Sequence, residues 1–299
     1  MAVEIKTYLN EGGAKAERRL RELTAADPGP FALVKEAMEY SLLAGGKRVR
    51  PLLCVAAAEA CGGDADLALT YGCTLEMIHT YTLIHDDLPA MDNDELRRGK
   101  ASNHVVYGEA QALLAGCGLL TWAYEIMADQ AVQGKIDATV AARIIAETSH
   151  AIGWAGTMGG QSLDMIYTER GHADDDELEF MEHAKTAKLL ITAVRNGALV
   201  AGADEQTLAR LTVYGEKIGL AFQVADDVLD VVADQEKLGK PVGSDARQGK
   251  TTYVDRLGLD GARELLQTLL DEALAALGGM DDKADALREL ARFIVQRAY

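Results

Sequence analysis

The chain has few basic residues: 30 Lys and Arg stand against 47 Asp and Glu in 299 residues, a formal net charge of −17. Nucleic-acid binding depends on clustered Lys and Arg that displace counterions from phosphates, so this composition argues against a nucleic-acid partner. Uninterrupted apolar runs such as residues 52–58 are far shorter than the ~20 residues of a membrane-spanning helix. The first ten residues include Glu4 and Lys6 and no apolar signal core, so we expect a cytoplasmic protein without a membrane span.

Cysteine and proline are also scarce. The four cysteines, at positions 54, 61, 73 and 117, form no Cys-x-x-Cys pair, so we expect neither a disulfide framework nor a zinc site. No proline occurs between Pro89 and Pro241, whereas Ala and Leu are abundant. Because proline breaks helices while Ala and Leu favour them, this long stretch predicts an all-α fold.

Apolar residues recur at three- and four-residue spacing in nine segments, which predicts amphipathic helices. The segments are 31–43, 52–60, 67–83, 110–131, 140–152, 180–201, 208–232, 262–277 and 284–295. Turn signals separate many of them, at 27–30, 45–46, 62–63, 171, 239–249 and 278–279. Since composition does not change abruptly along the chain, we expect a single domain over residues 1–299, built as a bundle of about ten helices.

Acidic residues gather in apolar surroundings at two places. The first cluster, Asp86, Asp87 and Asp92, follows Leu83 and Ile84 and surrounds Pro89. On a regular helix, Asp92 would lie about 120° around the axis from Asp86. Because Pro89 can kink or end the helix near itself, we expect the three carboxylates to converge at this break.

The second acidic cluster contains Asp226, Asp227 and Asp230, preceded by Gln223. All four side chains lie within an arc of about 100° on one helix face. Three like charges on an otherwise apolar helix repel each other and are costly to bury unless a cation binds them. Carboxylate oxygens suit hard divalent ions, so the two clusters favour magnesium sites over a solvated acidic face such as residues 174–176.

The few basic residues are concentrated in islands. These are Gly-Gly-Lys-Arg-Val-Arg-Pro at 45–51, Arg-Arg-Gly-Lys at 97–100, Lys-Thr at 185–186, and a glycine-rich stretch, 239–252, with Lys240 and Lys250. Glycine lets backbone amides approach an anion, and Arg and Lys complete a phosphate site. Together with two magnesium-type clusters, the islands indicate a substrate that carries a diphosphate.

In this order the motifs resemble those of the trans-isoprenyl diphosphate synthases, the polyprenyl synthetase family. The resemblance covers nearly the whole chain and includes Gly-Gly-Gln-Ser-Leu-Asp at 159–164. It implies an all-helical bundle around a central cavity, with the two aspartate motifs facing each other across its mouth, and a homodimer. The spacing from Asp86 to Asp92 is similar to that of bacterial short-chain farnesyl and geranylgeranyl diphosphate synthases.

The resemblance also implies roles for single residues. About three Mg²⁺ ions, for which Mn²⁺ could substitute, would be held by Asp86, Asp87, Asp92, Asp226, Asp227 and Asp230. The allylic diphosphate would be bound by Arg97, Lys185, Thr186, Gln223, Lys240 and Lys250. Isopentenyl diphosphate would be bound by Gly46, Lys47, Arg50, His79 and Arg98. The expected catalytic residues are Asp86, Asp87, Asp92, Arg97, Lys185, Asp226 and Asp227.

The expected reaction needs no protein nucleophile. The sequence contains no Ser/His/Asp pattern, no Gly-x-Gly-x-x-Gly turn and no Walker loop. Metal ions and basic side chains would stabilise the departing allylic diphosphate, and the isopentenyl double bond would attack the allylic cation. The released diphosphate is the natural acceptor of the proton that is lost, so no protein general base is assigned.

Product length is expected to depend on Tyr81 and Thr82. They precede Asp86 by five and four residues, about 6–8 Å along a helix, and could form a floor for the growing chain. An aromatic residue here resembles farnesyl synthases, so we expect farnesyl diphosphate as the main product, with geranylgeranyl diphosphate as the alternative. The family's farnesyl synthases often finish in a basic tail, whereas the last five residues of this chain carry one cation, Arg297.

Three Glu-x-x-His matches, at 76–79, 147–150 and 169–172, suggest a different class of protein. This pattern supplies ligands in di-iron helical bundles. A di-iron site explains neither the aspartate clusters nor the basic islands, and the third match spans Gly171 in a predicted turn. We therefore keep a di-iron bundle only as the alternative.

Overall fold

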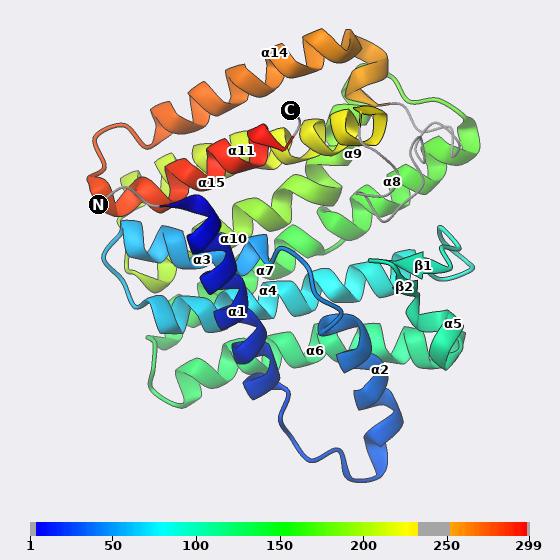
Figure 1. The fold of residues 1–299 in the computed structure, drawn as a ribbon. Coiled ribbons are helices and arrows are strands. Elements are labelled where there is room, and N and C mark those ends of the chain that lie inside the picture. Colours follow the sequence, from blue (N-terminus) through cyan, green and yellow to red (C-terminus); the bar gives the residue numbers. More distant parts are fainter. Residues whose placement is uncertain (1–3, 233–251, 298–299) are drawn as a thin grey trace.

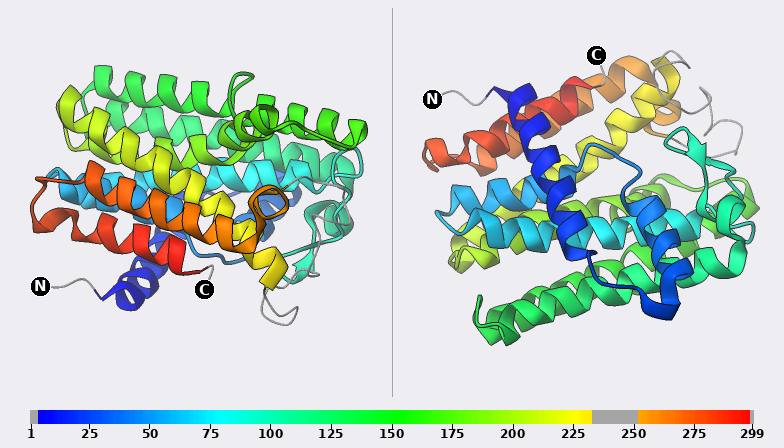
Figure 2. Two further views of the ribbon diagram at one scale, coloured as in Figure 1. Left: turned by 90° about the horizontal axis from the view of Figure 1, so that it is seen from above. Right: turned by 60° about the horizontal axis from the view of Figure 1, so that its bottom comes forward.

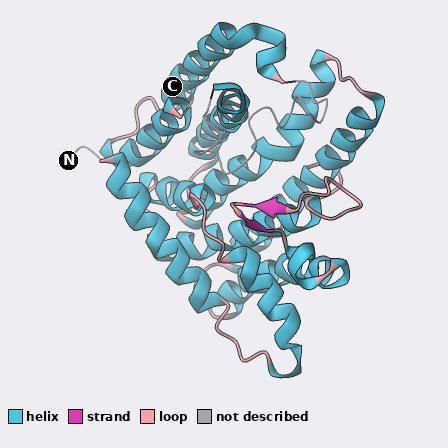
Figure 3. Ribbon diagram, turned by 45° about the vertical axis from the view of Figure 1, so that its right-hand side comes forward, coloured by secondary structure: helices cyan, strands magenta, loops and turns pink. Residues whose placement is uncertain are grey.

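A computed structural model of the chain describes residues 4–232 and 252–297 (Figure 1). Its α-helices are α1 (Ile5–Leu23), α2 (Ala32–Leu42), α3 (Val49–Ala60), α4 (Ala65–Asp86), α5 (Asn103–Tyr107), α6 (Glu109–Val132), α7 (Ala138–Ile152), α8 (Thr157–Arg170), α9 (Asp175–Glu182), α10 (Lys188–Val200), α11 (Glu205–Val232), α14 (Tyr253–Ala276) and α15 (Asp285–Gln296). Strands in the described residues are limited to the antiparallel pair β1 (Leu96–Arg97) and β2 (Lys100–Ala101), as Figure 3 shows. The prediction of an all-α fold is confirmed.

Helix α4 forms the centre of the bundle. The Asp64 carboxylate begins it by accepting hydrogen bonds from the backbone N–H groups of Asp66 and Leu67, at 2.9 and 3.1 Å. Fourteen of its 22 residues are buried, and they include every residue from Thr70 to Ile78. A helix buried on all sides lies in the interior of a protein, and α4 packs against α3, α6 and α10 (Figures 1 and 2).

Helices α11, α14 and α15 cover the α3 and α10 side of this centre (Figure 2). Helix α14 begins at a capping box, in which the Thr252 hydroxyl accepts from the N–H of Asp255 and the Asp255 carboxylate accepts from the N–H of Thr252. One core of buried apolar residues extends from Ala16 in α1 to Val295 in α15. Helices α4 and α11 both end on the right-hand side in Figure 1, so this packing brings the two aspartate motifs to one end of the bundle.

The nine predicted segments correspond to α2, α3, α4, α6, α7, α10, α11, α14 and α15. Apolar spacing did not indicate α1, α5, α8 or the start of α9. Helices α1 and α8 each contain a glycine pair, and α1 buries only Ala16 and Leu20, so their apolar pattern is weak. The predicted helix over 180–201 is also interrupted, because α9 is followed by a π-helical turn, His183–Ala187, before α10 begins.

Candidate active site

The first aspartate motif lies where α4 ends. Asp86 is the last residue of the helix, and the chain then turns back, with the N–H of Asp92 donating to the carbonyl oxygen of Asp86 at 2.9 Å. The helix ends three residues before Pro89, as the sequence predicts. The pKa of the Asp86 carboxyl is raised to about 6, chiefly by burial and also by the nearby Asp92 and Asp87 carboxylates, while Lys185 and Arg97 oppose the shift.

Asp87 is turned toward the hairpin that follows. Its side chain is 3% exposed, and its Oδ1 accepts from Arg97 Nε at 2.9 Å. Arg97 also donates to Asp94 at 3.2 Å. The two hairpin residues between the strands, Arg98 and Gly99, both have positive φ, which is the conformation of a tight two-residue turn. The hairpin therefore holds Arg97 against Asp87 and places Arg98 beside it.

The second aspartate motif lies near the end of α11. Asp227 is buried, and it accepts from Gln223 Nε2 at 3.1 Å and from the backbone N–H of Tyr253, the first residue of α14, at 2.8 Å. Asp226 is half-exposed and pairs with Arg297, which lies just after α15. The Arg297 guanidinium also stacks over the Phe222 ring, with its central carbon 4.5 Å from the ring centroid. Arg297, the one cation among the last five residues of the sequence, therefore contacts the second aspartate motif.

The carboxylates of the two motifs fit magnesium chemically, since they offer only hard oxygen donors. Among residues 4–232 and 252–297, no three His, Cys, Asp or Glu side chains gather closely enough to hold a metal ion. Asp87 and Asp226 each contact an arginine instead, and Asp227 contacts Gln223 and the start of α14. Asp92 and Asp230 are partly exposed. The structure therefore places the six aspartates at one end of the bundle without gathering them into a metal cluster.

Lys185 occupies the π-helical turn between α9 and α10. Its Nζ donates to Asp164 Oδ2 at 2.5 Å. Burial alone would lower the pKa of Lys185, but the carboxylates of Asp164, Asp86 and Asp92 hold it above its ordinary value. A side chain at Gly160 would lie 2.6 Å from the backbone nitrogen of Lys185, so only glycine lets α8 approach this turn. Turns of π-helix are rare in proteins, and those that occur are often found at functional sites. This one therefore supports the predicted role of Lys185 and the adjacent Thr186.

A group of arginines surrounds His79 on α4. Arg50, Arg98, Arg97 and Arg48 all act on this imidazole, and burial together with their charges lowers the pKa of His79 well below its ordinary value. Gly46 makes room for the group, since a side chain there would lie 2.9 Å from the central carbon of the Arg98 guanidinium. Gly45 accepts a hydrogen bond from Arg98. The structure thus brings Gly46, Arg50, His79 and Arg98 together.

Lys47 joins this group from the side of the second motif. Burial lowers the pKa of Lys47, Arg297 lowers it further, and Asp226 opposes both. The negative charges of Glu76 on α4 and of Asp226 both act to raise the pKa of Arg50. These shared neighbours connect the arginine group to the second aspartate motif.

The predicted product-length residues differ in their surroundings. Tyr81 is 7% exposed and packs edge-on against His85, with ring centroids 4.9 Å apart. Burial raises the pKa of Tyr81 to about 12, and the charges of Asp86 and of Cys117 on α6 contribute. The Thr82 hydroxyl donates to the carbonyl oxygen of His79 at 2.8 Å. Tyr81 is therefore the larger and better-placed candidate for the floor. Lys240 and Lys250 lie outside the described residues.

Sequence reasoning assigned no role to Arg48, Glu76, Asp164 or Arg297. Arg48 stands inside the first basic island, and Asp164 ends the Gly-Gly-Gln-Ser-Leu-Asp motif. Glu76 was considered only as part of a Glu-x-x-His match, and Arg297 only as an isolated cation. In each case the sequence shows a charged residue within or beside a motif. It does not show the partner of that residue, which lies far away along the chain.

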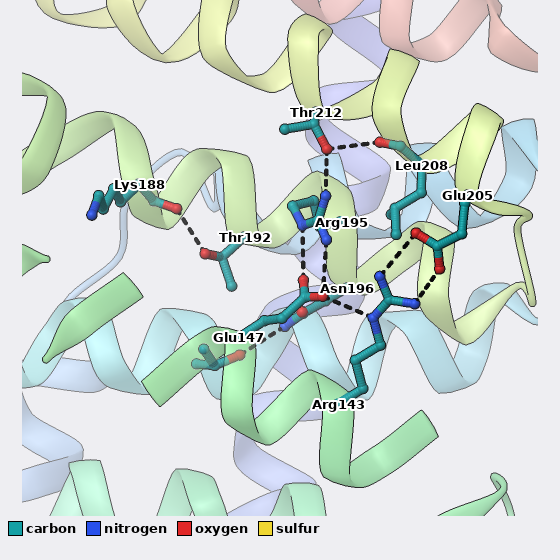
Figure 4. Close-up of polar contacts among 10 residues, drawn as sticks. Arg143, Glu147, Lys188, Thr192, Arg195, Asn196, Glu205, Leu208 and Thr212 are labelled. Carbon is teal, nitrogen blue, oxygen red and sulfur yellow. Dashed lines mark hydrogen bonds and ion pairs between the residues drawn. The ribbon is translucent and has the colours of Figure 1, made fainter. Parts of the chain in front are cut away.

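The Glu-x-x-His matches do not form a di-iron site. Glu147 accepts from Arg143 Nε at 2.9 Å and from Arg195 Nε at 2.8 Å, in a network between α7, α10 and α11 (Figure 4). Glu76 pairs with Arg48, and the third match, at 169–172, is exposed at the end of α8. Two of the three glutamates pair with arginines, and the described residues gather none of the three matches into a metal site, so the structure gives the di-iron alternative no support.

Comparisons with known proteins agree with the geometry. The family model described as polyprenyl synthetase matches residues 31–290. A geranylgeranyl diphosphate synthase from Cyanophora paradoxa is 43% identical over 97% of this chain and 96% of its own length. A farnesyl diphosphate synthase from Geobacillus stearothermophilus is 42% identical over 99% of this chain and 98% of its own length. The chain belongs to the polyprenyl synthetase family and is a prenyltransferase.

The fold agrees with solved structures of the same family. The apo structure of an FPP/GFPP synthase from Zymomonas mobilis superposes with a TM-score of 0.86 and 36% sequence identity, covering 99% of this chain and all of the other. Within the described residues, no helix is both long and apolar enough to cross a membrane.

Proposed function

We propose that the chain condenses isopentenyl diphosphate with dimethylallyl and then geranyl diphosphate, and that farnesyl diphosphate is its main product. The observation that carries this product is the position of Tyr81, buried five residues before Asp86 and packed on His85. A prenyl chain that grows down α4 from Asp86 would meet this ring after about 6–8 Å. Relatives of both product classes are similar to this chain, so a geranylgeranyl product is the alternative.

The carboxylates of all six motif aspartates would hold magnesium with the allylic diphosphate: Asp86, Asp87, Asp92, Asp226, Asp227 and Asp230. When bound, about three such ions would neutralise the leaving diphosphate. Lys185, kept protonated by Asp164 and Asp86, donates hydrogen bonds to that diphosphate, together with Arg97. Thr186 and Gln223 lie beside the carbon from which it departs.

The arginine group binds the other substrate. Arg50, Arg98 and Lys47 hold the isopentenyl diphosphate, and His79 is neutral and adds a hydrogen bond. The allylic C–O bond breaks, a C–C bond forms from the isopentenyl double bond, and the proton lost from isopentenyl passes to the released diphosphate. The protein's part is to orient two diphosphates and stabilise the charge that develops on one of them.

We further propose that the chain acts in the cytoplasm as a homodimer formed through α6. This helix leaves the side chains of Leu113 and Leu114 about half exposed. The carbonyl oxygen of Leu113 accepts a hydrogen bond from His85 Nε2 at 3.1 Å. A second copy on this face would cover the two leucines and stiffen the helix beside Tyr81.

The function is tested by incubation with isopentenyl diphosphate and each allylic diphosphate in turn, with and without magnesium. We expect condensation only with magnesium, and chromatography should show farnesyl diphosphate as the main product. Absence of product in every combination would refute the proposal. Light scattering tests the dimer, and a monomeric mass at micromolar concentration would contradict it.

A further inference from the structure

Glu76 is a buried carboxylate at the centre of the arginine group. Its side chain is 2% exposed, its Oε1 accepts from Arg48 Nη1 at 2.8 Å, and the same oxygen lies 4.0 Å from Arg98 Nη2. Its Oε2 has no hydrogen-bond partner among the described residues. Burying a carboxylate is costly unless charged neighbours stabilise it, so the arginines account for its presence there.

The arginines of this group differ in how many donors they have left. Arg48 is completely buried, and it donates to Glu76, to the carbonyl oxygen of Leu42 at 2.6 Å and, through Nε, to Glu17 of α1 at 2.8 Å. Arg50, in contrast, keeps an unpartnered buried Nε. Arg48 therefore fixes Glu76 in place, while Arg50 has a donor left for an anion and Arg98 donates to the Gly45 carbonyl oxygen.

Glu76 opposes the positive charge that Arg50 and Arg98 present. Burial and the charge of Arg98 lower the pKa of Arg50 to about 10, and Glu76 acts in the opposite direction. The pKa of Arg98 is lowered by burial and by Arg48, and again Glu76 opposes the shift. The carboxylate thus compensates the mutual repulsion of the arginines and competes with any diphosphate that approaches them.

In the proposed reaction, the competition between Glu76 and diphosphate for Arg50 and Arg98 would help the intermediate product to leave. When two substrates condense, the allylic diphosphate is lost and the diphosphate of isopentenyl remains on the product. The ten-carbon product must then move its diphosphate from the arginine group to the aspartate motifs before a second condensation. A diphosphate bound too tightly by Arg50 and Arg98 would delay this transfer.

We propose that Glu76 is a positioning residue that limits the affinity of Arg50 and Arg98 for diphosphate, so that the intermediate product can leave them between two condensations. This inference rests on the proposed function, but its binding consequence can be measured without catalysis. Removing one buried charge near the site should tighten diphosphate binding by roughly three- to tenfold.

The test uses Glu76→Gln, which keeps the shape and one acceptor for Arg48 but removes the charge. Calorimetry with inorganic diphosphate in EDTA should show binding tighter by roughly three- to tenfold than in the unsubstituted protein. With substrates and magnesium, we expect a lower KM for isopentenyl diphosphate, a lower kcat and a larger share of geranyl diphosphate released. A purely structural role of Glu76 would weaken diphosphate binding or leave it unchanged.

Glu17→Gln is the matched control, because Glu17 also pairs with Arg48 but is on α1 and 28% exposed. Glu17 acts on Arg98 more weakly than Glu76 does, so we expect this variant to tighten diphosphate binding much less than Glu76→Gln. Should Glu76→Gln fail to fold, Glu76→Asp keeps the charge but withdraws it from Arg98 by one methylene, and a smaller gain in affinity is expected. Unchanged or weaker diphosphate binding in the folded variant overturns the inference. Tighter binding in a protein that makes no product with any substrate would refute the proposed function alone.

Discussion

The two aspartate motifs use their buried carboxylates differently. Asp87 pairs with a charged partner, Arg97, which a tight hairpin presents, whereas Asp227 accepts from the neutral amide of Gln223 and the backbone N–H of Tyr253. The first motif therefore depends on a loop after a helix that has ended, and the second on a continuous helix, α11, against which α14 begins. Among the residues that the structure describes, an arginine therefore contacts the buried carboxylate of the first motif, whereas a side-chain amide and a backbone N–H contact that of the second.

The largest expected effect follows from Asp87→Asn. It leaves the Arg97 guanidinium without its buried partner, which typically costs about 3–5 kcal/mol of stability. Because the hairpin would also release Arg97, we expect kcat to fall by roughly 10²–10³. Urea unfolding and initial rates measure the two effects. Asp94→Asn is the control, since Asp94 makes the longer contact with Arg97 at 3.2 Å, and equal losses in both variants would contradict the ion-pair role.

Tyr81→Ala tests whether the first motif's helix also sets product length. Opening the floor five residues before Asp86 should shift the main product from farnesyl to geranylgeranyl diphosphate, measured by chromatography. Thr82→Ala should leave the product nearly unchanged, because that hydroxyl is bonded to the backbone at His79. If Tyr81→Ala made the same product as the unsubstituted chain, the hypothesis that Tyr81 limits product length would be wrong.

Asp227→Asn tests the buried carboxylate of the second motif. An asparagine retains one oxygen for Tyr253 but loses the charge and one acceptor, so we expect a stability loss of about 1–3 kcal/mol. The loss should concentrate at the start of α14, where hydrogen exchange of the Tyr253 and Val254 amides measures it. If it equals the loss in Asp87→Asn, the two motifs do not differ as described.

Arg297→Gln addresses the arginine of the second motif. Arg297 pairs with Asp226, whose side chain is 44% exposed, so it competes with any cation that binds there. Without Arg297 we expect the magnesium concentration at half-maximal activity to fall by roughly two- to threefold, with little change in stability. A rise in that concentration would show instead that Arg297 assists the site.

The smallest expected effect concerns pH. The pKa of His79 is far below its ordinary value in the folded protein, so the unfolded chain binds a proton below about pH 6.5 that the folded one does not. Stability should therefore fall as the pH drops below that value, by about 1 kcal/mol per pH unit from this group. His79→Gln should reduce the slope of stability between pH 6.5 and 5.5, measured by urea midpoints. An unaltered slope would exclude the imidazole as its source.

Much of this site could be predicted from the sequence because its residues stand in contiguous motifs. The end of α4 near Pro89 and the shared helix of Gln223, Asp226 and Asp230 followed from backbone rules alone. The partners of the charged groups could not be predicted in this way. Arg48 and Glu76 are 28 residues apart, Arg297 and Asp226 are 71 apart, and only the packing of α3 on α4 and of α15 on α11 brings them together.

The π-helical turn His183–Ala187 has a consequence for how this segment tolerates change. Such a turn contains one residue more than an α-helix needs, and each residue of an α-helix rotates the chain by about 100°. Deleting a single residue here would restore a regular helix. If α10 kept its packing, the deletion would rotate Lys185 away from Asp164, which now accepts its hydrogen bond. The segment should therefore tolerate no single-residue deletion, even one that spares Lys185 and Thr186, because its length determines where those two side chains lie.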